Sequence, residues 1–461
     1  MVHRAHETHL HFVGIGGIGM SGIAEVFLNQ GYPVTGSDLA EGESTRRLQG
    51  LGARILFGHR AENVGEKVDV VVLSSAVRPT NPEVLEAKRR RIPIIPRAEM
   101  LGELMRGKVG IAVGGTHGKT TTTSMLATIL THANLDPTLV IGGRVDSLGG
   151  NAKLGQGRFV VAEADESDGS FLHLPATFGV VTNIDNDHLD HFGSLTAIED
   201  AFISFVGKLP FYGLAAVCGD DSGVKRCLPR WNKPVVTYGF GPDNDYIAAE
   251  VRPTGFGSHF EVHHRGQLLG SVQLNVPGNH NVLNAMASAV IALRLEVPFE
   301  TVAAGLEIFG GVKRRFEIRW RDDSRKQVIV DDYGHHPTEI LATLSAAKSY
   351  WPGRIVVVFQ PHRYSRTLNC RDGFMTAFRD ADVVMITDIY SAGEEPIEGV
   401  SAESLVQDIQ RVALPRQEIQ YVGDLEHAKA AVLMAFQPGD LVLCFGAGSI
   451  TQLPGRLVDA L

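Results

Sequence analysis

Two glycine-rich loops, each between an apolar run and a stretch with helical spacing, constrain the fold of this chain more than any other feature. The first lies in HLHFVGIGGIGMSGIAEVF (residues 9–27) and the second in VGIAVGGTHGKTTTTSMLATIL (residues 109–130). Glycine tolerates backbone conformations that other residues avoid, and 51 of the 461 residues are glycine. A strand, a glycine turn and a helix, in this order, open a parallel sheet. The two loops therefore predict an α/β protein with more than one such sheet.

The same order of apolar run, turn and helical stretch begins again near residues 10, 109 and 327. At roughly 150 residues per domain, the length also favours about three domains. We expect a Rossmann-like N-terminal domain (1–107), a central P-loop ATPase-like domain (108–311) and a Rossmann-like C-terminal domain (312–461). Strands are expected at 10–13, 68–73, 109–113, 159–162, 178–182, 327–330, 355–359, 383–386 and 441–445.

The overall charge argues against nucleic acid as a partner. Lys and Arg number 43 against 52 Asp and Glu, a net charge of -9, so any phosphate ligand must be held locally. The four cysteines form no Cys-x-x-Cys pair, which fits a reducing compartment. No secretory signal pattern and no run of about 18 apolar residues is visible. We expect a cytoplasmic protein with no membrane insertion, as a monomer or weak dimer.

The first loop has the spacing of a nucleotide-binding turn. Gly14, Gly16 and Gly19 follow G-x-G-x-x-G, in which the helix N-terminus supplies N–H groups for a phosphate. Asp38 ends a plausible second strand, where such folds place a carboxylate on a ribose hydroxyl. These residues favour nucleotide binding over a tight turn without a ligand, but they do not choose the nucleotide.

The second loop resembles a shortened P-loop. Lys119 and Thr120 stand where a lysine meets the outer phosphates and a threonine hydroxyl meets magnesium, although Val113 replaces the usual first glycine. The strand in FVVAEADESDGSF ends in acids that are suited to magnesium, and some of these acids are expected to form only a solvated turn. The acids of this segment are Glu163, Asp165, Glu166 and Asp168.

A second polar segment, TNIDNDHLDHFGS, contains His188. His188 is either a metal or phosphate ligand or part of a surface loop.

Seven motifs in one order identify a family resemblance that covers essentially the whole chain. They are GGTHGKTTT, AEADESD, TNIDNDHLD, GNHNVLNA, GVKRRFE, DDYGHHPTE and FQPHRYSRT. In this respect the sequence resembles the Mur ligases, ATP-dependent enzymes that build the peptide stem of bacterial peptidoglycan. It looks most like the members that add L-alanine to UDP-N-acetylmuramate.

The resemblance implies a site for ATP and Mg²⁺. Lys119 would contact the outer phosphates, Thr120 and Glu163 would hold magnesium, and His188 would lie near a second ion. Asn281 and Asn284 match positions near adenine, and Asn281 is also a candidate helix N-cap. The implied ATP-binding residues are Gly115, Thr116, His117, Gly118, Lys119, Thr120, Thr121, Asn281, Asn284, Arg315 and Asp332.

Two further sites follow from the resemblance. The amino acid would meet Tyr333, His335, His362, Arg363 and Arg366, since a guanidinium suits a carboxylate. UDP, rather than NAD, would occupy the first loop. The implied UDP-sugar residues are Gly14, Gly16, Gly17, Gly19, Met20, Ser21 and Asp38, with His59 and Ser74 added only because they lie near strand ends.

The expected reaction is a ligation through an acyl phosphate, with closure of the C-terminal domain before chemistry. Lys119, Glu163, His188, Arg315, Asp332 and His335 are the candidate catalytic residues, and His335 and His188 are the candidate bases for the amine. Two alternatives are a related ligase that adds a recycled tripeptide to UDP-N-acetylmuramate and, from another class, an NAD-dependent dehydrogenase. Dehydrogenase activity would not explain the second glycine-rich loop.

Overall fold

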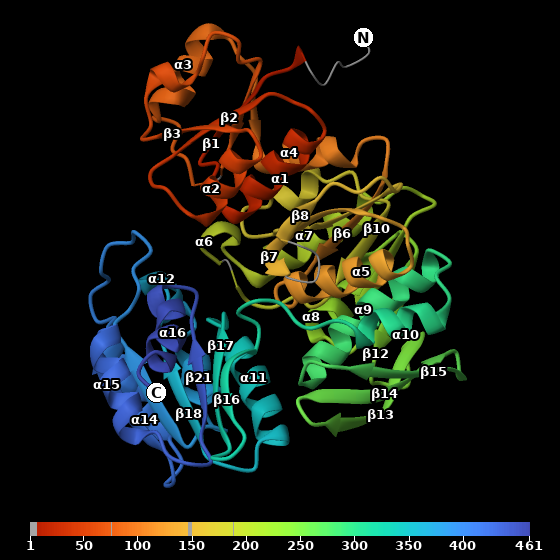
Figure 1. Cartoon of the computed structure of the whole chain (residues 1–461). Coiled ribbons are helices and arrows are strands. Elements are labelled where there is room, and N and C mark those ends of the chain that lie inside the picture. The colour runs from red at the N-terminus through yellow and green to blue at the C-terminus, as the bar shows by residue number, and fades with distance from the viewer. Residues whose placement is uncertain (1–6, 75, 146–149, 188) are drawn as a thin grey trace. The chain divides into compact units, whose positions relative to one another are not determined.

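The computed structural model describes residues 7–74, 76–145, 150–187 and 189–461, and it is an α/β protein built on three sheets (Figure 1). The chain forms two compact units. Unit 1 comprises Met1–Ala249, Glu261–Val272 and Leu283–Phe309, and unit 2 comprises Glu250–Phe260, Gln273–Val282 and Gly310–Leu461. The α/β class is confirmed. The domain cuts at 107/108 and 311/312 stay predictions.

The first sheet is parallel, with strand order β3-β2-β1-β4-β5. β1 is buried along its whole length, because helices cover both faces of such a sheet. The chain runs from β1 to one edge of the sheet and then returns to β4 on the other side of β1, so the loop after β1 lies at a topological switch point. The elements are β1 (Leu10–Val13), α1 (Ile18–Asn29), β2 (Val34–Asp38), α2 (Glu43–Gly50), β3 (Arg54–Phe57), β4 (Val70–Leu73), α3 (Pro82–Arg90), β5 (Ile94–Pro96) and α4 (Arg97–Met105).

The second sheet has ten strands in the order β15-β14-β13-β12-β11-β10-β6-β9-β7-β8. β6 lies between β9 and β10, which brings the ends of three parallel strands together around the second glycine loop. The strands are β6 (Val109–Gly114), β7 (Thr138–Val145), β8 (Gly150–Lys153), β9 (Phe159–Glu163), β10 (Phe178–Val181), β11 (Leu214–Cys218), β12 (Val235–Gly239), β13 (Tyr246–Thr254), β14 (Gly257–His264) and β15 (Gln267–Leu274). The helices are α5 (Lys119–His132), α6 (Leu189–Phe192), α7 (Leu195–Gly207), α8 (Ser222–Cys227), α9 (Asn279–Arg294) and α10 (Phe299–Glu307).

The third sheet has the order β16-β17-β21-β18-β19-β20, and its parallel central strands β17, β21, β18 and β19 are buried on both faces. Alternate residues of its strands enter two separate cores: Val330 and Val357 pack with α11, whereas Ile329 and Val356 pack with α15 and α16. This is the pattern of a covered parallel sheet. Its elements are β16 (Glu317–Asp322), β17 (Gln327–Asp332), α11 (Pro337–Tyr350), β18 (Ile355–Phe359), α12 (Tyr364–Asn369), α13 (Arg371–Ala377), β19 (Val383–Thr387), α14 (Ala402–Val412), β20 (Glu418–Gly423), α15 (Leu425–Ala435), β21 (Leu441–Phe445) and α16 (Leu453–Val458).

The expected strands all occur, some with ends shifted by one or two residues. Strands β12 to β15, among others, were not predicted. Within the described parts of the chain, no helix is both long and apolar enough to cross a membrane.

Candidate functional site

The loop between β6 and α5 requires glycine at both of its ends. Gly115 has φ +128°, and a Cβ there would lie 1.9 Å from Oγ1 of Thr182. Gly118, the N-cap of α5, has φ +82°, and a Cβ there would lie 2.5 Å from Oδ1 of Asn284. The loop therefore lies tightly against its neighbours, and the N–H groups in the first turn of α5 are placed to receive an anion.

Lys119 folds back over this loop. Its Nζ donates to the carbonyl oxygens of Gly115 (2.7 Å) and Thr116 (3.0 Å) and to Oε1 of Glu166 (2.8 Å). Burial raises the pKa of Glu166 to about 7, although the ammonium of Lys119 opposes that rise. Burial lowers the pKa of Lys119, but Glu166 and Asp165 outweigh this effect and the net shift is upward. Lys119 is thus a protonated group fixed at the loop.

Thr120 and Glu163 place two oxygen ligands side by side. Thr120 Oγ1 donates to Oε2 of Glu163 at 3.1 Å, and the N–H of Gly142 donates to Oε1 at 2.6 Å. Burial raises the pKa of Glu163, against the effect of the Gly142 N–H and of Lys119. A hydroxyl and a carboxylate are ligands that Mg²⁺ prefers, so this donor set fits the ion.

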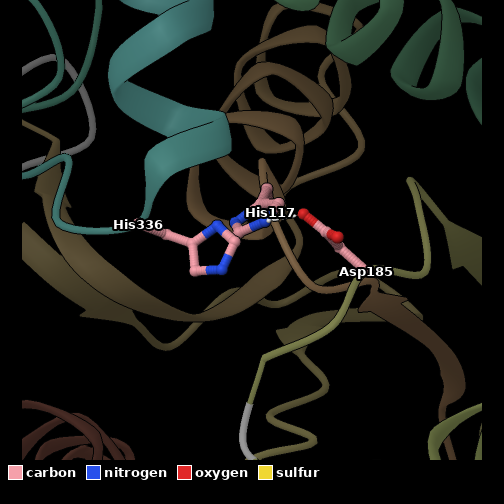
Figure 2. A group of neighbouring side chains, drawn as sticks. All are labelled: His117, Asp185 and His336. Carbon is pink, nitrogen blue, oxygen red and sulfur yellow. Dashed lines mark hydrogen bonds and ion pairs between the residues drawn. The ribbon is translucent and has the colours of Figure 1, made fainter. Parts of the chain in front are cut away.

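His117 is bound on the other side of the loop by residues that follow β10. Its N–H donates to Oδ1 of Asn183 (2.8 Å), and its Nε2 lies 3.0 Å from Oδ2 of Asp185. Figure 2 shows the His117 ring beside the Asp185 carboxylate. The N–H of Asp185 donates in turn to Oγ1 of Thr116 at 2.9 Å. Figure 2 also labels His336, the N-cap of α11 in unit 2. The loop is therefore held by side chains from a second strand end.

The remaining residues predicted near ATP have varied surroundings. Thr121 is buried in α5, and Oδ1 of Asn284 accepts from Thr122 Oγ1 at 3.1 Å. The expectation of an N-cap at Asn281 is wrong, because α9 begins at Asn279 and the Asn281 side chain donates to the Pro277 carbonyl at 2.7 Å. His188, predicted as a metal ligand and candidate base, lies outside the described residues.

The first glycine loop is held by Asp38. Oδ2 of Asp38 accepts from the N–H of Gly16 at 2.8 Å, and Oδ1 accepts from Leu39 at 2.7 Å. A Cβ at Gly16 would meet this carboxylate at 2.8 Å, and Gly14 has φ +78°. Asp38 thus fixes the loop through backbone N–H groups, and its contact with a ribose stays a prediction.

The other residues predicted for UDP lie along the same sheet edge. Ser74 follows β4, and His59 lies two residues beyond the end of β3. Gly17 is the N-cap of α1, whereas the Met20 side chain is 1% exposed and belongs to the core. Ser21 is also buried. The Met20 side chain is therefore part of the core and not a ligand contact.

Arg97, at the start of α4, was not predicted. Its Nη1 lies 2.7 Å from the position of a Cβ at Gly19, and its Nη2 donates to Oδ2 of Asp165 at 3.0 Å. Arg97 therefore connects the turn of the first loop with the acidic motif after β9.

In unit 2, Arg315, Asp332 and Glu339 form a polar group at the end of β17. Nη1 of Arg315 donates to Oε1 of Glu339 at 3.2 Å. Asp332 accepts from the N–H groups of Phe316 (2.8 Å) and Gly334 (2.7 Å). Burial raises the pKa of Asp332 to about 6, and Arg315 opposes that rise. Asp332 is thus integrated into its own loop by backbone bonds.

The residues predicted for the amino acid come together where β17 and β18 end. Nδ1 of His335 lies 3.0 Å from the Tyr333 carbonyl oxygen, and the rings of His335 and His362 are 5.9 Å apart. Arg366 Nη1 lies 3.5 Å from Nδ1 of His362, and Arg363, with φ +68°, donates its N–H to the Tyr390 carbonyl at 2.8 Å. Burial, together with Arg366 and Arg363, lowers the pKa of His362 to about 4. The cluster combines cations with neutral imidazole.

Several residues of these sites were missed. Glu166 was grouped with a possible solvated turn, yet its side chain is buried and pairs with Lys119. Glu339 accepts from the His335 N–H at 3.1 Å and forms a capping box with His336, a signal that the spacing HPTE could have revealed.

His280 borders a cavity of about 330 Å³ lined in part by Gly278, Asn279, Ala346 and Tyr350.

Three family models match successive parts of the chain. Residues 9–109 match the Mur ligase family catalytic domain, residues 113–292 the Mur ligase middle domain, and residues 314–448 the domain described as Mur ligase, glutamate ligase domain.

Similar proteins include two with the same name. The UDP-N-acetylmuramate--L-alanine ligase of Geotalea uraniireducens is 55% identical over 452 residues, covering 98% of both chains, and that of Geobacter sulfurreducens is 56% identical over 445 residues, covering 96% of this chain and 95% of its own. Among solved structures, the UDP-N-acetylmuramate-alanine ligase of Thermotoga maritima matches with TM-score 0.83 at 32% identity over 98% of both chains. A murein peptide ligase of Psychrobacter arcticus matches with TM-score 0.71 at 25% identity over 98% of both. The chain belongs to the Mur ligase family.

Proposed function

We propose that this enzyme joins L-alanine to the lactyl carboxylate of UDP-N-acetylmuramate at the expense of ATP. The observation that carries the proposal is the second glycine loop, where Lys119 donates to the carbonyls of the loop and Thr120 donates to Glu163. A separate glycine loop at the switch point of another sheet supports a second nucleotide ligand. Full-length relatives at 55% and 56% identity that bear the name of this activity support the choice of substrates.

The reaction must first activate a carboxylate, which is a poor electrophile. An oxygen of the lactyl carboxylate forms a bond to the γ-phosphorus of ATP, and the bond to the β-phosphate oxygen breaks to release ADP. The amine of L-alanine then attacks the acyl carbon and loses a proton to a base, and the C–O bond to phosphate breaks. Lys119 and the N–H groups at the start of α5 stabilise the negative charge on the transferred group.

Magnesium belongs to this proposal through Thr120 and Glu163. Their oxygens lie 3.1 Å apart at the start of α5, and oxygen donors of this kind suit a hard divalent cation. When bound, Mg²⁺ supplies positive charge that neutralises the phosphate oxygens of ATP. We expect Glu163→Gln to raise the magnesium concentration needed for half-maximal activity, and an unchanged requirement would remove Glu163 from the site.

The amino-acid cluster supports a small acceptor with a free carboxylate. Arg363 and Arg366 supply guanidinium groups that match a carboxylate, and Tyr333, His335 and His362 surround the same strand ends. His335 is a candidate base because its Nδ1 is oriented by the Tyr333 carbonyl. The roles of Arg315 and Asp332 toward ATP, the role of His188, a cytoplasmic location and the oligomeric state stay predictions.

A tripeptide-adding ligase is the second candidate, because a murein peptide ligase also matches along 98% of the chain. Its lower TM-score and identity, 0.71 and 25% against 0.83 and 32%, favour the alanine-adding activity.

Phosphate release tests the proposal. Purified protein with ATP, Mg²⁺ and UDP-N-acetylmuramate should release phosphate when L-alanine is added, and more slowly with other amino acids or with L-alanyl-γ-D-glutamyl-meso-diaminopimelate. Equal release with and without L-alanine, or faster release with the tripeptide, would contradict it. Lys119→Met, which removes the ammonium, should abolish release, whereas Lys348→Met, on α11, should not.

A further inference from the structure

A buried carboxylate lies under the carboxyl edge of the first sheet. Glu83, in the first turn of α3, is fully buried and accepts from four side chains. Oε2 accepts from His11 Nε2 (2.9 Å) and Ser37 Oγ (2.7 Å), and Oε1 accepts from Asn63 Nδ2 (3.0 Å) and His59 Nδ1 (2.9 Å). Burial raises the pKa of Glu83, but these hydrogen bonds outweigh burial and the net shift is downward. Glu83 is therefore an ionised acceptor.

This carboxylate determines which nitrogen of His59 carries the proton. An ionised carboxylate cannot donate, so the hydrogen bond at 2.9 Å requires a proton on Nδ1 of His59. Ser37 Oγ, which is 3.2 Å from the same Nδ1, donates its own hydrogen to Glu83 and can only accept from the ring. In neutral His59, Nε2 is then an acceptor. In the described part of the chain the hydrogen bonds of the His59 ring involve Nδ1, and the side chain is 18% exposed.

His59 lies on the side of the sheet where a nucleotide base would be. The phosphate-binding turn follows β1, Asp38 ends β2, and His59 follows β3, the next strand in the sheet order. A nucleotide whose phosphates bind at the start of α1 and whose ribose lies near the end of β2 extends its base toward β3. The ring of uracil carries one N–H donor, at N3, between two carbonyl oxygens.

We propose that Glu83 is a positioning residue for the uracil of the sugar nucleotide: it holds the Nδ1–H of His59, so that Nε2 accepts from N3–H of the base. The inference rests on the proposed function, because it takes a uridine nucleotide as the ligand of the first loop. It adds a side chain that recognises the base, His59, and a carboxylate that fixes the protonation of its ring, Glu83. A neutral amide at position 83 can donate to Nδ1 and so reverse the tautomer, as happens when a carboxylate that orients a catalytic histidine becomes an amide.

Calorimetric binding of two nucleotides to the full chain tests this arrangement. UDP carries the N3–H, and 3-methyluridine 5′-diphosphate lacks it. The parent protein should bind UDP at least about tenfold more tightly, and Glu83→Gln should reduce that preference to about threefold or less. The control Glu86→Gln, on the same helix but paired with Arg89 at the surface, should keep the full preference. In steady-state assays, Glu83→Gln should raise KM for UDP-N-acetylmuramate about tenfold with kcat within twofold.

A second variant and a spectroscopic signature keep the test decisive if Glu83→Gln does not fold. His59→Ala should lose the preference for UDP, and Glu83→Gln added to it should cause no further loss. Nitrogen-15 spectra of labelled histidine, with the His59 signals assigned by their loss in His59→Ala, should show the hydrogen on Nδ1. An Nε2–H tautomer in the parent, or a full UDP preference in His59→Ala, would overturn the inference. If the parent binds no uridine nucleotide at all, the proposed function fails instead.

Discussion

At the residue scale, burial sets the protonation of groups beside the candidate sites. It raises the pKa of Glu166 to about 7 and of Asp332 to about 6. His280 moves the other way: burial and the nearby Arg315 lower its pKa to about 4, with Glu339 opposing them. The two carboxyl groups therefore change charge at a higher pH than ordinary carboxyl groups, and His280 changes charge at a lower pH than an ordinary imidazole.

His280 predicts a specific pH dependence of stability. Its pKa is depressed in the folded state from an ordinary value of 6.5, so the unfolded chain binds the proton more readily. The contribution of His280 to the free energy of unfolding is therefore present above pH 6.5 and is lost as the pH drops toward 4. Between pH 7.5 and pH 5 this loss is about 1–2 kcal/mol. In urea unfolding, His280→Gln should lose correspondingly less stability over that interval, whereas His427→Gln, at an exposed site, should behave as the parent does. An identical pH dependence in His280→Gln and the parent would contradict the assignment.

Short-range motifs explain which site residues could be predicted. Lys119, Thr120 and Glu163 follow from two segments whose spacing is itself the signal. The partners of these residues are set by tertiary packing: Glu166 is 47 positions from Lys119, and Glu83 is 24 from His59. No local pattern distinguishes Glu166 from Asp168, which accepts from the N–H of Ser170 within its own turn. The sequence therefore predicts which groups are candidates for the chemistry better than it predicts the side chains that position them.

At the element scale, the two glycine turns were predictable, and the strands β13 to β15 were not. The turns are flanked by uniformly apolar strands such as β6. By contrast, β13 contains Pro253 and is mostly exposed along its second half, and β15 contains Gly270 with φ +151°. Strands with one solvated face and such residues lack the continuous apolar run that marks a buried parallel strand.

The turn before α5 gives a prediction at this scale. Gly115→Ala should destabilise the protein by about 3 kcal/mol, because it combines a strained positive φ with a Cβ 1.9 Å from Thr182 Oγ1. Gly207→Ala is the matched control: Gly207 ends α7 with open space around it, so alanine should stabilise by about 0.5 kcal/mol. Urea unfolding measures both. Equal effects of the two substitutions would show that the loop can relax around a side chain.

At the scale of the whole molecule, Arg97 connects elements that belong to different sheets. It begins α4, which follows the last strand of the first sheet, and it pairs with Asp165 beyond β9 of the second sheet. Burial raises the pKa of Asp165, but Lys119, Arg97 and the hydrogen bonds from Ser167 together outweigh burial, and the net shift is downward. The pair lies 68 positions apart in the sequence, so only the assembled structure reveals it.

A double-mutant cycle measures what this connection contributes. Arg97→Met and Asp165→Asn, alone and combined, should show a coupling free energy of about 0.5–1 kcal/mol in urea unfolding, since both side chains are partly exposed. The coupling should shrink in high salt. Strictly additive effects would mean that the pair contributes no net stability.

The proposed function requires that ATP activate the carboxylate of the sugar nucleotide in the site around Lys119, and oxygen tracing distinguishes this route. UDP-N-acetylmuramate labelled with ¹⁸O in both oxygens of its lactyl carboxylate is converted with ATP, Mg²⁺ and L-alanine, and the released phosphate is analysed by mass spectrometry. The acyl phosphate route predicts one ¹⁸O atom in each phosphate, because the oxygen that attacks phosphorus leaves with it. Phosphate without the label would contradict activation of the carboxylate by ATP.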